Sequence, residues 1–192
     1  MTVPVDPEEF LSSFLPARFA QLASAFEGVT SVGSITFRVP PRGEWSLRLT
    51  AGSLEVTRGE DDDAMVQITV PEQDFAVLIS ESVERTLALA KPASPGPLKA
   101  LIAKPDTARM IRHVPGSVLF VARNGDVRHR LLVTPGRRLS NLDAAECTID
   151  CALSDMIDGQ SRGISPMQLF MAGKLKLTGN VQIAMALAGA FG

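Results

Sequence analysis

Hydrophobic and polar positions alternate along two stretches of the chain with the period of β-strands. Trp45, Leu47 and Leu49, for example, alternate with polar residues, as in a strand that buries one face. Alternation and turn signals predict two sets of four strands, at 34–39, 45–50, 53–59 and 65–70, and at 117–123, 127–134, 137–141 and 146–152. Each set is typical of a four-strand meander, followed by a helix after Pro71 in the first set and near Ser154 in the second.

A segment predicted to be helical precedes each set of strands. Residues 6–27 carry one apolar stripe and predict a helix that begins at Asp6, is kinked or split at Pro16 and ends at Gly28. The stripe consists of Phe10, Phe14, Leu15, Phe19, Leu22 and Phe26. Residues 91–97 are predicted as a linker, and 97–112 as a helix interrupted at Pro105.

The chain closes with a helix opened by Ser165-Pro166, a strand at 174–179 and a helix from Asn180. Within 181–191 the single polar residue is Gln182. A helix that is apolar all round is buried on every side or lies against something apolar that is not protein. This one is shorter than the about 20 residues that span a bilayer. The tail therefore either packs inside the protein or lies against an apolar ligand.

The two strand-rich stretches resemble each other in sequence. Gly33–Phe37 aligns with Gly116–Phe120 at an offset of 83, and Ala64–Ile68 aligns with Ala145–Ile149 at an offset of 81. So small a drift predicts an internal duplication. We expect a first half at 1–96 and a second half at 97–192, of which only the second carries the helix–strand–helix tail.

The tail carries Phe170, the run Gly-Lys-Leu-Lys-Leu-Thr-Gly-Asn at 173–180 and the run Ala-Met-Ala-Leu at 184–187. In order and spacing it resembles the sterol carrier protein family, of the non-specific lipid-transfer type. Trp45–Leu49 and Ile68–Phe75 resemble the family's strand patterns in the first half. A second aromatic residue that the family has before its last strand is Met171 here. The second half matches the meander poorly, so the chain departs from a single family domain.

The resemblance implies an α+β fold, with two sterol-carrier-like halves that pack helices on mostly antiparallel sheets. It also implies a cavity for a fatty acyl, sterol-like or isoprenoid lipid, formed by one half or by both, with the closing helix as a lid. The expected ligand-binding residues are Leu169, Phe170, Met171, Ile183, Met185 and Leu187. Gln182 and Lys174 are candidates for a headgroup contact. The alternative is that these apolar side chains fill a core, and that the chain is a non-catalytic module for protein interaction or dimerisation.

Charge is distributed unevenly, with a net −7 over residues 1–96, +7 over 97–138 and −2 over 139–192. Either the parts attract one another, or a basic surface makes transient contact with anionic membrane lipid. Tyr is absent and Trp45 is the single Trp, which argues against a base-stacking surface for nucleic acid. We find no signal peptide or membrane span and expect a cytoplasmic protein, with a homodimer as one option.

The remaining reactive residues predict no catalytic or metal site. Cys147 and Cys151 would lie about 13 Å apart in a strand, beyond the about 7 Å that a disulfide allows, so buried reduced thiols are expected. The acidic run 60–63 lacks the spacing of a calcium loop and is predicted as a solvated turn. No nucleophile motif accompanies His129, and no cofactor fingerprint is present. A weaker reading is an enzyme that uses Asp150 and Asp155.

Overall fold

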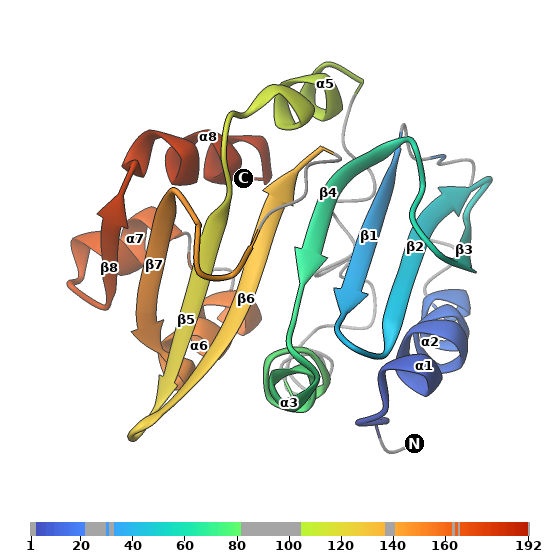
Figure 1. The fold of residues 1–192 in the computed structure, drawn as a ribbon, viewed down its shortest axis with the longest axis horizontal. Helices are drawn as coiled ribbons and strands as arrows, with labels where there is room; N and C mark the ends of the chain where they lie inside the picture. Colours follow the sequence, from blue (N-terminus) through green and yellow to red (C-terminus); the bar gives the residue numbers. More distant parts are fainter. Residues whose placement is uncertain are drawn as a thin grey trace.

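A single sheet of eight strands runs through the molecule in the computed structural model (Figure 1). The structure describes residues 3–21, 30, 33–81, 105–136, 141–162, 164 and 166–191. The strand order is β3-β2-β1-β4-β6-β5-β7-β8. Five of the seven strand pairs are antiparallel, which confirms the expected α+β class with a mostly antiparallel sheet. The two halves share this one sheet.

Strands β1 to β4 belong to the first half and lie where the alternation predicts them. They are β1 (Ser34–Val39), β2 (Gly43–Thr50), β3 (Ser53–Arg58) and β4 (Ala64–Thr69). The predicted meander is wrong in one respect, because β4 does not pair with β3. It lies parallel to β1, on the side of β1 opposite to β2.

Strands β5 to β8 belong to the second half. They are β5 (Val118–Asn124), β6 (Val127–Pro135), β7 (Cys147–Ala152) and β8 (Leu175–Gly179). The strand predicted at 137–141 falls largely on residues 137–140, which lie outside the described residues, and Asn141 is not in a strand. β7 lies parallel to β5, as β4 does to β1.

The two halves therefore repeat one pairing pattern. In each, the first strand pairs antiparallel with the second and parallel with the last of its set, as β1 does with β2 and β4, and β5 with β6 and β7. The outer edge of β7 pairs antiparallel with β8, whereas the outer edge of β4 pairs antiparallel with β6. A strand of the second half thus serves the first half as its fifth strand. A common origin of the halves stays a prediction.

The N-terminal helix begins where the sequence predicts. The Asp6 side chain accepts a hydrogen bond from the backbone N–H of Glu9 at 3.1 Å, and Pro7 follows as the first helical residue. α1 (Pro7–Glu9) leads into a π-helical turn, η1 (Phe10–Phe14), and then into α2 (Leu15–Ala20). The predicted split at Pro16 is not seen, because the chain stays helical from Pro7 to Ala20 and Pro16 occupies the first turn of α2. The predicted end at Gly28 lies outside the described residues.

Further helices connect and flank the strands. α3 (Glu72–Phe75) and η3 (Ala76–Glu81) follow β4, and α6 (Leu153–Arg162) follows β7. α5 (Pro105–His113) precedes β5 and lies at the opposite end of the central strands from α3 (Figure 1). α7 (Pro166–Met171) and α8 (Val181–Phe191) enclose β8 in sequence, as predicted. The linker at 91–97 is not among the described residues.

One face of the sheet carries most of the apolar side chains. Register pairs place Trp45, Phe37, Ile68, Val133, Val118 and Cys147 in one row across six strands, and directly opposed residues share a face. At the β2 end of this row lies core 1, and at the β7 end core 2. Core 1 contains Phe10, Leu11, Phe14, Phe19, Trp45, Leu47, Leu49 and Phe75, among others. Core 2 contains Met65, Val66, Ala108, Ile111, Val118, Cys147, Ile149, Leu169, Leu175, Ile183, Ala184 and Leu187, among others.

Helix length and hydropathy bear on membrane insertion. Within the part of the chain that the structure describes, none of the helices combines the length and apolar character that a membrane crossing requires.

Candidate ligand-binding site

The tail packs onto the second half of the sheet. Leu169 of α7, with Ile183 and Leu187 of α8, is buried in core 2, together with Leu175 of β8. The structure thus brings three of the six predicted ligand-binding residues together. All three belong to the same cluster of buried apolar side chains, which also contains Cys147 and Ile149 of β7.

The other three predicted residues lie on the surface. Phe170 is 44 % exposed, Met171 78 % and Met185 53 %. α8 is therefore not covered on every side by the described residues, contrary to one of the two expectations for an all-apolar helix. Its inner face presents Ile183, Ala184 and Leu187 to core 2, and its outer face presents Met185 to solvent.

Two glycines explain how closely the tail approaches the sheet. A Cβ on Gly179 would lie 2.3 Å from the carbonyl oxygen of Glu146, and one on Gly116 would lie 2.6 Å from Cδ1 of Ile183. Both glycines have positive φ, +86° and +112°. The Glu146 carboxylate also accepts hydrogen bonds from the backbone N–H and the hydroxyl of Ser117, at 2.7 and 2.9 Å. At the start of α8, the backbone N–H of Asn180 donates a hydrogen bond to the carbonyl oxygen of Glu146 at 2.8 Å, which ties the tail to the chain just before β7.

Core 2 also contains residues that the sequence reasoning did not assign to the site. Ala108 and Ile111 come from α5, which packs beside α8, and Met65 comes from β4 of the first half. The spacing of Ala108 and Ile111 on one helical face was a usable signal. The contribution of Met65 depends on the pairing of β4 with β6, which no local pattern indicates.

The candidate headgroup contacts lie apart from the core. Nζ of Lys174 lies 2.7 Å from Oδ1 of Asp155, at the start of α6. Gln182 is exposed, and its backbone N–H donates to the side chain of Asn180 at 3.2 Å, which caps α8 as predicted. These contacts give Lys174 and the Gln182 backbone structural roles at the ends of β8.

An equivalent acidic residue in the first half is buried. Oδ1 of Asp74, on α3, lies 3.0 Å from Nδ1 of His129 on β6, and Oδ2 accepts the backbone N–H of Arg130 at 3.1 Å. The side chains of Asp74 and His129 are 7 % and 10 % exposed. Asp155 holds the corresponding place on the helix after β7, and its partner Lys174 precedes β8. In each half, an Asp on the helix after the last strand of the set therefore pairs with a basic side chain on or next to the antiparallel strand that adjoins that last strand, β6 beside β4 and β8 beside β7.

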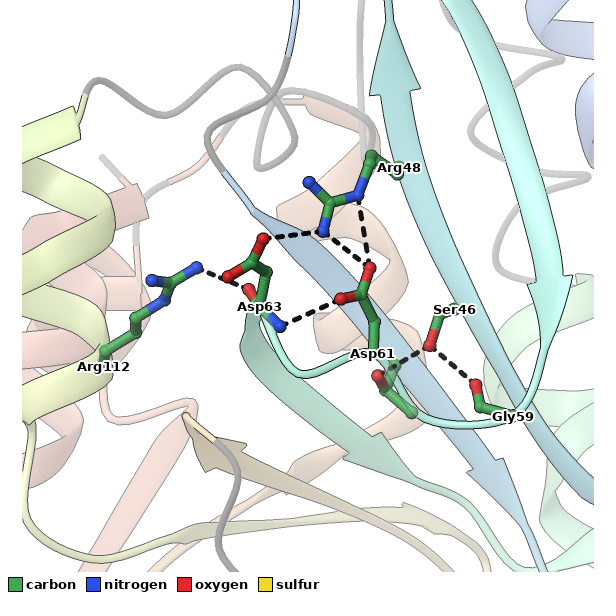
Figure 2. A network of polar contacts seen from close by, with 7 residues as sticks. Ser46, Arg48, Gly59, Asp61, Asp63 and Arg112 are labelled. Carbon is green, nitrogen blue, oxygen red and sulfur yellow. Dashed lines mark hydrogen bonds and ion pairs between the residues drawn. The ribbon is translucent and has the colours of Figure 1, made fainter.

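The acidic run at 60–63 supports the turn before β4 (Figure 2). The guanidinium of Arg48 lies 2.7 Å from Oδ2 of Asp61 and 3.1 Å from Oδ2 of Asp63, and Arg112 of α5 donates to the carbonyl oxygen of Asp63 at 2.5 Å. Burial pushes the pKa of Asp61 upward, but the backbone N–H of Asp63 and the Arg48 guanidinium outweigh this and hold the pKa below its usual range. Among the described residues, no group of three or more acidic, His or Cys side chains is placed to hold a metal ion.

The two cysteines and the two acids of the weaker enzyme reading are buried or paired. Cys147 and Cys151 are free and buried. Burial raises the pKa of both thiols, that of Cys151 to about 11, which keeps them protonated and unreactive. Asp150, one of the two acids of the weaker enzyme reading, lies 2.6 Å from Nε of Arg123. Both of those acids, Asp150 and Asp155, are thus engaged in ion pairs.

Two surface hollows lie at corresponding places in the two halves. One, of about 600 Å³, lies at the β1–β2 hairpin and is lined by Arg38, Pro40, Pro41, Gly43, Glu44, Arg58, Gly59 and Thr69. The other, of about 310 Å³, lies at the β5–β6 hairpin and is lined by Arg123, Asn124, Gly125, Ala152, Leu153, Ser154 and Ile157. Neither is lined by a predicted ligand-binding residue, and both carry charged side chains.

Comparison with known proteins places the second half in a family. Residues 98–192 match the model of the SCP-2 sterol transfer family. Among solved structures, sterol carrier protein 2 like 2 from Aedes aegypti is 18 % identical, with 58 % of this chain and 97 % of that chain covered and a TM-score of 0.34. The apo form of sterol carrier protein 2 from Yarrowia lipolytica is 20 % identical, with 58 % and 88 % covered and a TM-score of 0.35. The search of curated proteins finds no significant match.

Proposed function

Because residues 98–192 belong to the SCP-2 sterol transfer family, we propose that the chain binds a hydrophobic lipid-like molecule and transfers it. The ligand class is a fatty acyl, sterol-like or isoprenoid lipid, and the binding is non-covalent. The observation that carries the proposal is the two-sided character of α8, whose inner face belongs to core 2 while Met185 on its outer face is exposed.

Burial of apolar surface would supply the binding free energy. Each Å² of apolar ligand surface removed from water contributes about 25 cal/mol. Met65 of β4 is part of core 2, and methionine adapts to ligands of different shape. In this proposal α8 is the lid, and Ile183 and Leu187 are the side chains that ligand entry would displace from their packing.

Native mass spectrometry of the purified protein, followed by organic extraction and lipid identification, tests the proposal first. We expect a co-purified lipid in stoichiometric amount, or saturable binding of a fluorescent fatty acid or sterol after lipid removal. Hydrogen exchange then tests the lid. Bound lipid should slow the amide exchange of α8. The β2–β3 hairpin, at the opposite edge of the sheet from β8, is the internal control, and its exchange rates should not change.

A specific observation favours a second candidate, a non-catalytic interaction module. Three of the six large hydrophobic side chains found exposed among the described residues lie in the tail, namely Phe170, Met171 and Met185. Such a surface also suits a homodimer contact. The transient membrane contact, predicted from the basic residues of 97–138, stays a prediction. A protein that purifies without lipid and binds neither the fluorescent fatty acid nor the fluorescent sterol would favour this candidate. The absence of catalysis and the cytoplasmic location stay predictions.

A further inference from the structure

Five side chains near the middle of the apolar sheet face are only partly buried, although Ile35, Val66, Val118 and Ala122, on the same face of these strands, are buried. We name five partly buried side chains at this place the seam strip: Phe37, Ile68, Phe120, Leu131 and Val133. In the row across the strands, Trp45 on one side is 1 % exposed and Cys147 on the other is 0 % exposed. Side chains on the central strands of a large sheet are expected to be the most deeply buried. The partial exposure of the seam strip therefore needs an explanation.

The five side chains form one continuous surface. Phe37 is opposite Ile68, and Ile68 is opposite Val133, so the first three lie in one row across β1, β4 and β6. Leu131 is opposite Phe120 and lies two residues from Val133 on β6, which puts it on the same face. The seam strip therefore crosses four strands, a width of about 14 Å at about 4.8 Å per strand spacing.

The seam strip lies where the two cores meet. Phe37 and Leu131 pack against core 1, Phe120 and Val133 pack against core 2, and Ile68 packs against both. Two of its side chains come from the first half and three from the second. Both halves therefore contribute apolar side chains to their junction, and these side chains are less buried than those of either core.

A buried polar pair ends the seam strip on one side. His129 lies two residues from Leu131 on β6, hence on the same face, and its Nδ1 pairs with Asp74. With Nδ1 engaged, the second ring nitrogen is the remaining hydrogen-bonding atom of this histidine. Small-molecule sites commonly combine an apolar wall with a few polar groups that fix orientation.

We propose that the seam strip is the wall of the lipid site, and that the ligand lies along β4, β6 and β5 with its one polar end toward the Asp74–His129 pair. This inference rests on the proposed function and assigns the site to both halves. The occupant is an elongated apolar molecule with a single polar end. The seam strip itself contains no charged side chain, which suits an apolar body, and the adjoining pair offers a hydrogen-bonding group at one end only.

Photo-crosslinking on the unmodified protein tests the location. A diazirine-bearing fatty acid and a diazirine-bearing sterol are bound in separate samples and irradiated, and the labelled peptides are mapped. We expect labels on β4 and β6, with the more efficiently incorporated probe identifying the ligand class. Labels confined to residues 166–191, or to the β1–β2 or β5–β6 hairpin, would overturn the seam site and leave the proposed function intact.

Two filling variants test the same point by affinity. Ile68→Trp and Val133→Trp place bulk in the seam strip from different halves, and each should weaken binding of dehydroergosterol or cis-parinaric acid at least tenfold. Val56→Trp is the matched control, since Val56 is also partly buried, faces Leu47 and packs on core 1 away from the strip; it should stay within twofold. Wild-type affinity in both seam variants would overturn the seam site, whereas a wild-type protein that binds neither probe would overturn the proposed function. If a variant does not fold, the crosslinking result on the unmodified protein decides whether the ligand binds at the seam strip.

Discussion

Core 1 and core 2 lie on the same face of one sheet but are built from different side chains. Core 1 is rich in buried aromatic rings, with Phe10 edge-on to Phe75 at 5.6 Å between ring centroids and Phe10 stacked on Phe14 at 5.5 Å. Among the residues that the structure describes, the buried members of core 2 include no aromatic residue and are aliphatic side chains with Met65 and Cys147. Interlocking rings leave little freedom to repack, whereas aliphatic and Met side chains adapt. The comparison suggests a structural first core and an adaptable second core.

The largest expected effect comes from truncating the aromatic core. Phe75→Ala removes a fully buried ring and should lower the free energy of unfolding by about 4 kcal/mol, because the surrounding rings cannot close the cavity. Leu187→Ala in core 2 should cost about 2 kcal/mol. Urea unfolding monitored by circular dichroism measures both. Equal losses would contradict the proposed difference between the cores.

A change at the join between tail and sheet should come next. Gly179→Ala places a Cβ within 2.3 Å of a backbone oxygen at a positive φ, and should lower the free energy of unfolding by about 3 kcal/mol. Gly173→Ala is the matched control, because Gly173 has φ +69° but nothing within 4 Å of its added Cβ, so about 1 kcal/mol is expected. Thermal unfolding compares the two. A Gly179 variant as stable as the control would mean that the tail is not held by this contact.

The two Asp–base pairs sharpen the comparison further. Asp74→Asn weakens a buried pair and should cost about 2 kcal/mol, because His129 and the Arg130 N–H lose a charged acceptor. Asp155→Asn weakens the more exposed pair with Lys174 and should cost about 0.5 kcal/mol. Denaturant titration of both variants beside the wild type gives the difference. Similar costs would show that burial of the first pair adds nothing to its strength.

The smallest expected effect is the pH dependence of the Asp61–Arg48 pair. The pKa of Asp61 is lowered in the folded protein, so its contribution is present above the unfolded value of 3.8 and is lost as the pH falls through the folded value. Asp61→Asn should therefore cost about 0.5 kcal/mol at pH 7 and progressively less below about pH 4. Urea midpoints at pH 7 and pH 3 test this. A constant difference at both pH values would exclude an electrostatic origin.

Most strands could be predicted because alternation is a local property. The strand at Trp45–Leu49 and the helix start at Asp6 follow from spacing and capping alone. The parallel placement of β4 beside β1 could not be read this way, since strand order depends on contacts between residues far apart in sequence. Local sequence also does not show which tail side chains face the sheet, so all six were expected to line the ligand cavity. Leu169, Ile183 and Leu187 lie in core 2, but Phe170, Met171 and Met185 face outward, and whether any of them contacts a ligand stays a prediction.

The pairing of β4 with β6 makes each half dependent on the other during biosynthesis. During synthesis the first half emerges from the ribosome before β6 has been made. Until then, the N–H and C=O groups on the edge of β4 that later pairs with β6 have no strand to pair with. Open strand edges invite pairing with other chains. Separating the halves, by proteolysis or by expression from residue 98 onward, would expose that edge on β6 as well. Such fragments should be prone to aggregate or to assemble with one another, and mixing the two should restore a soluble pair.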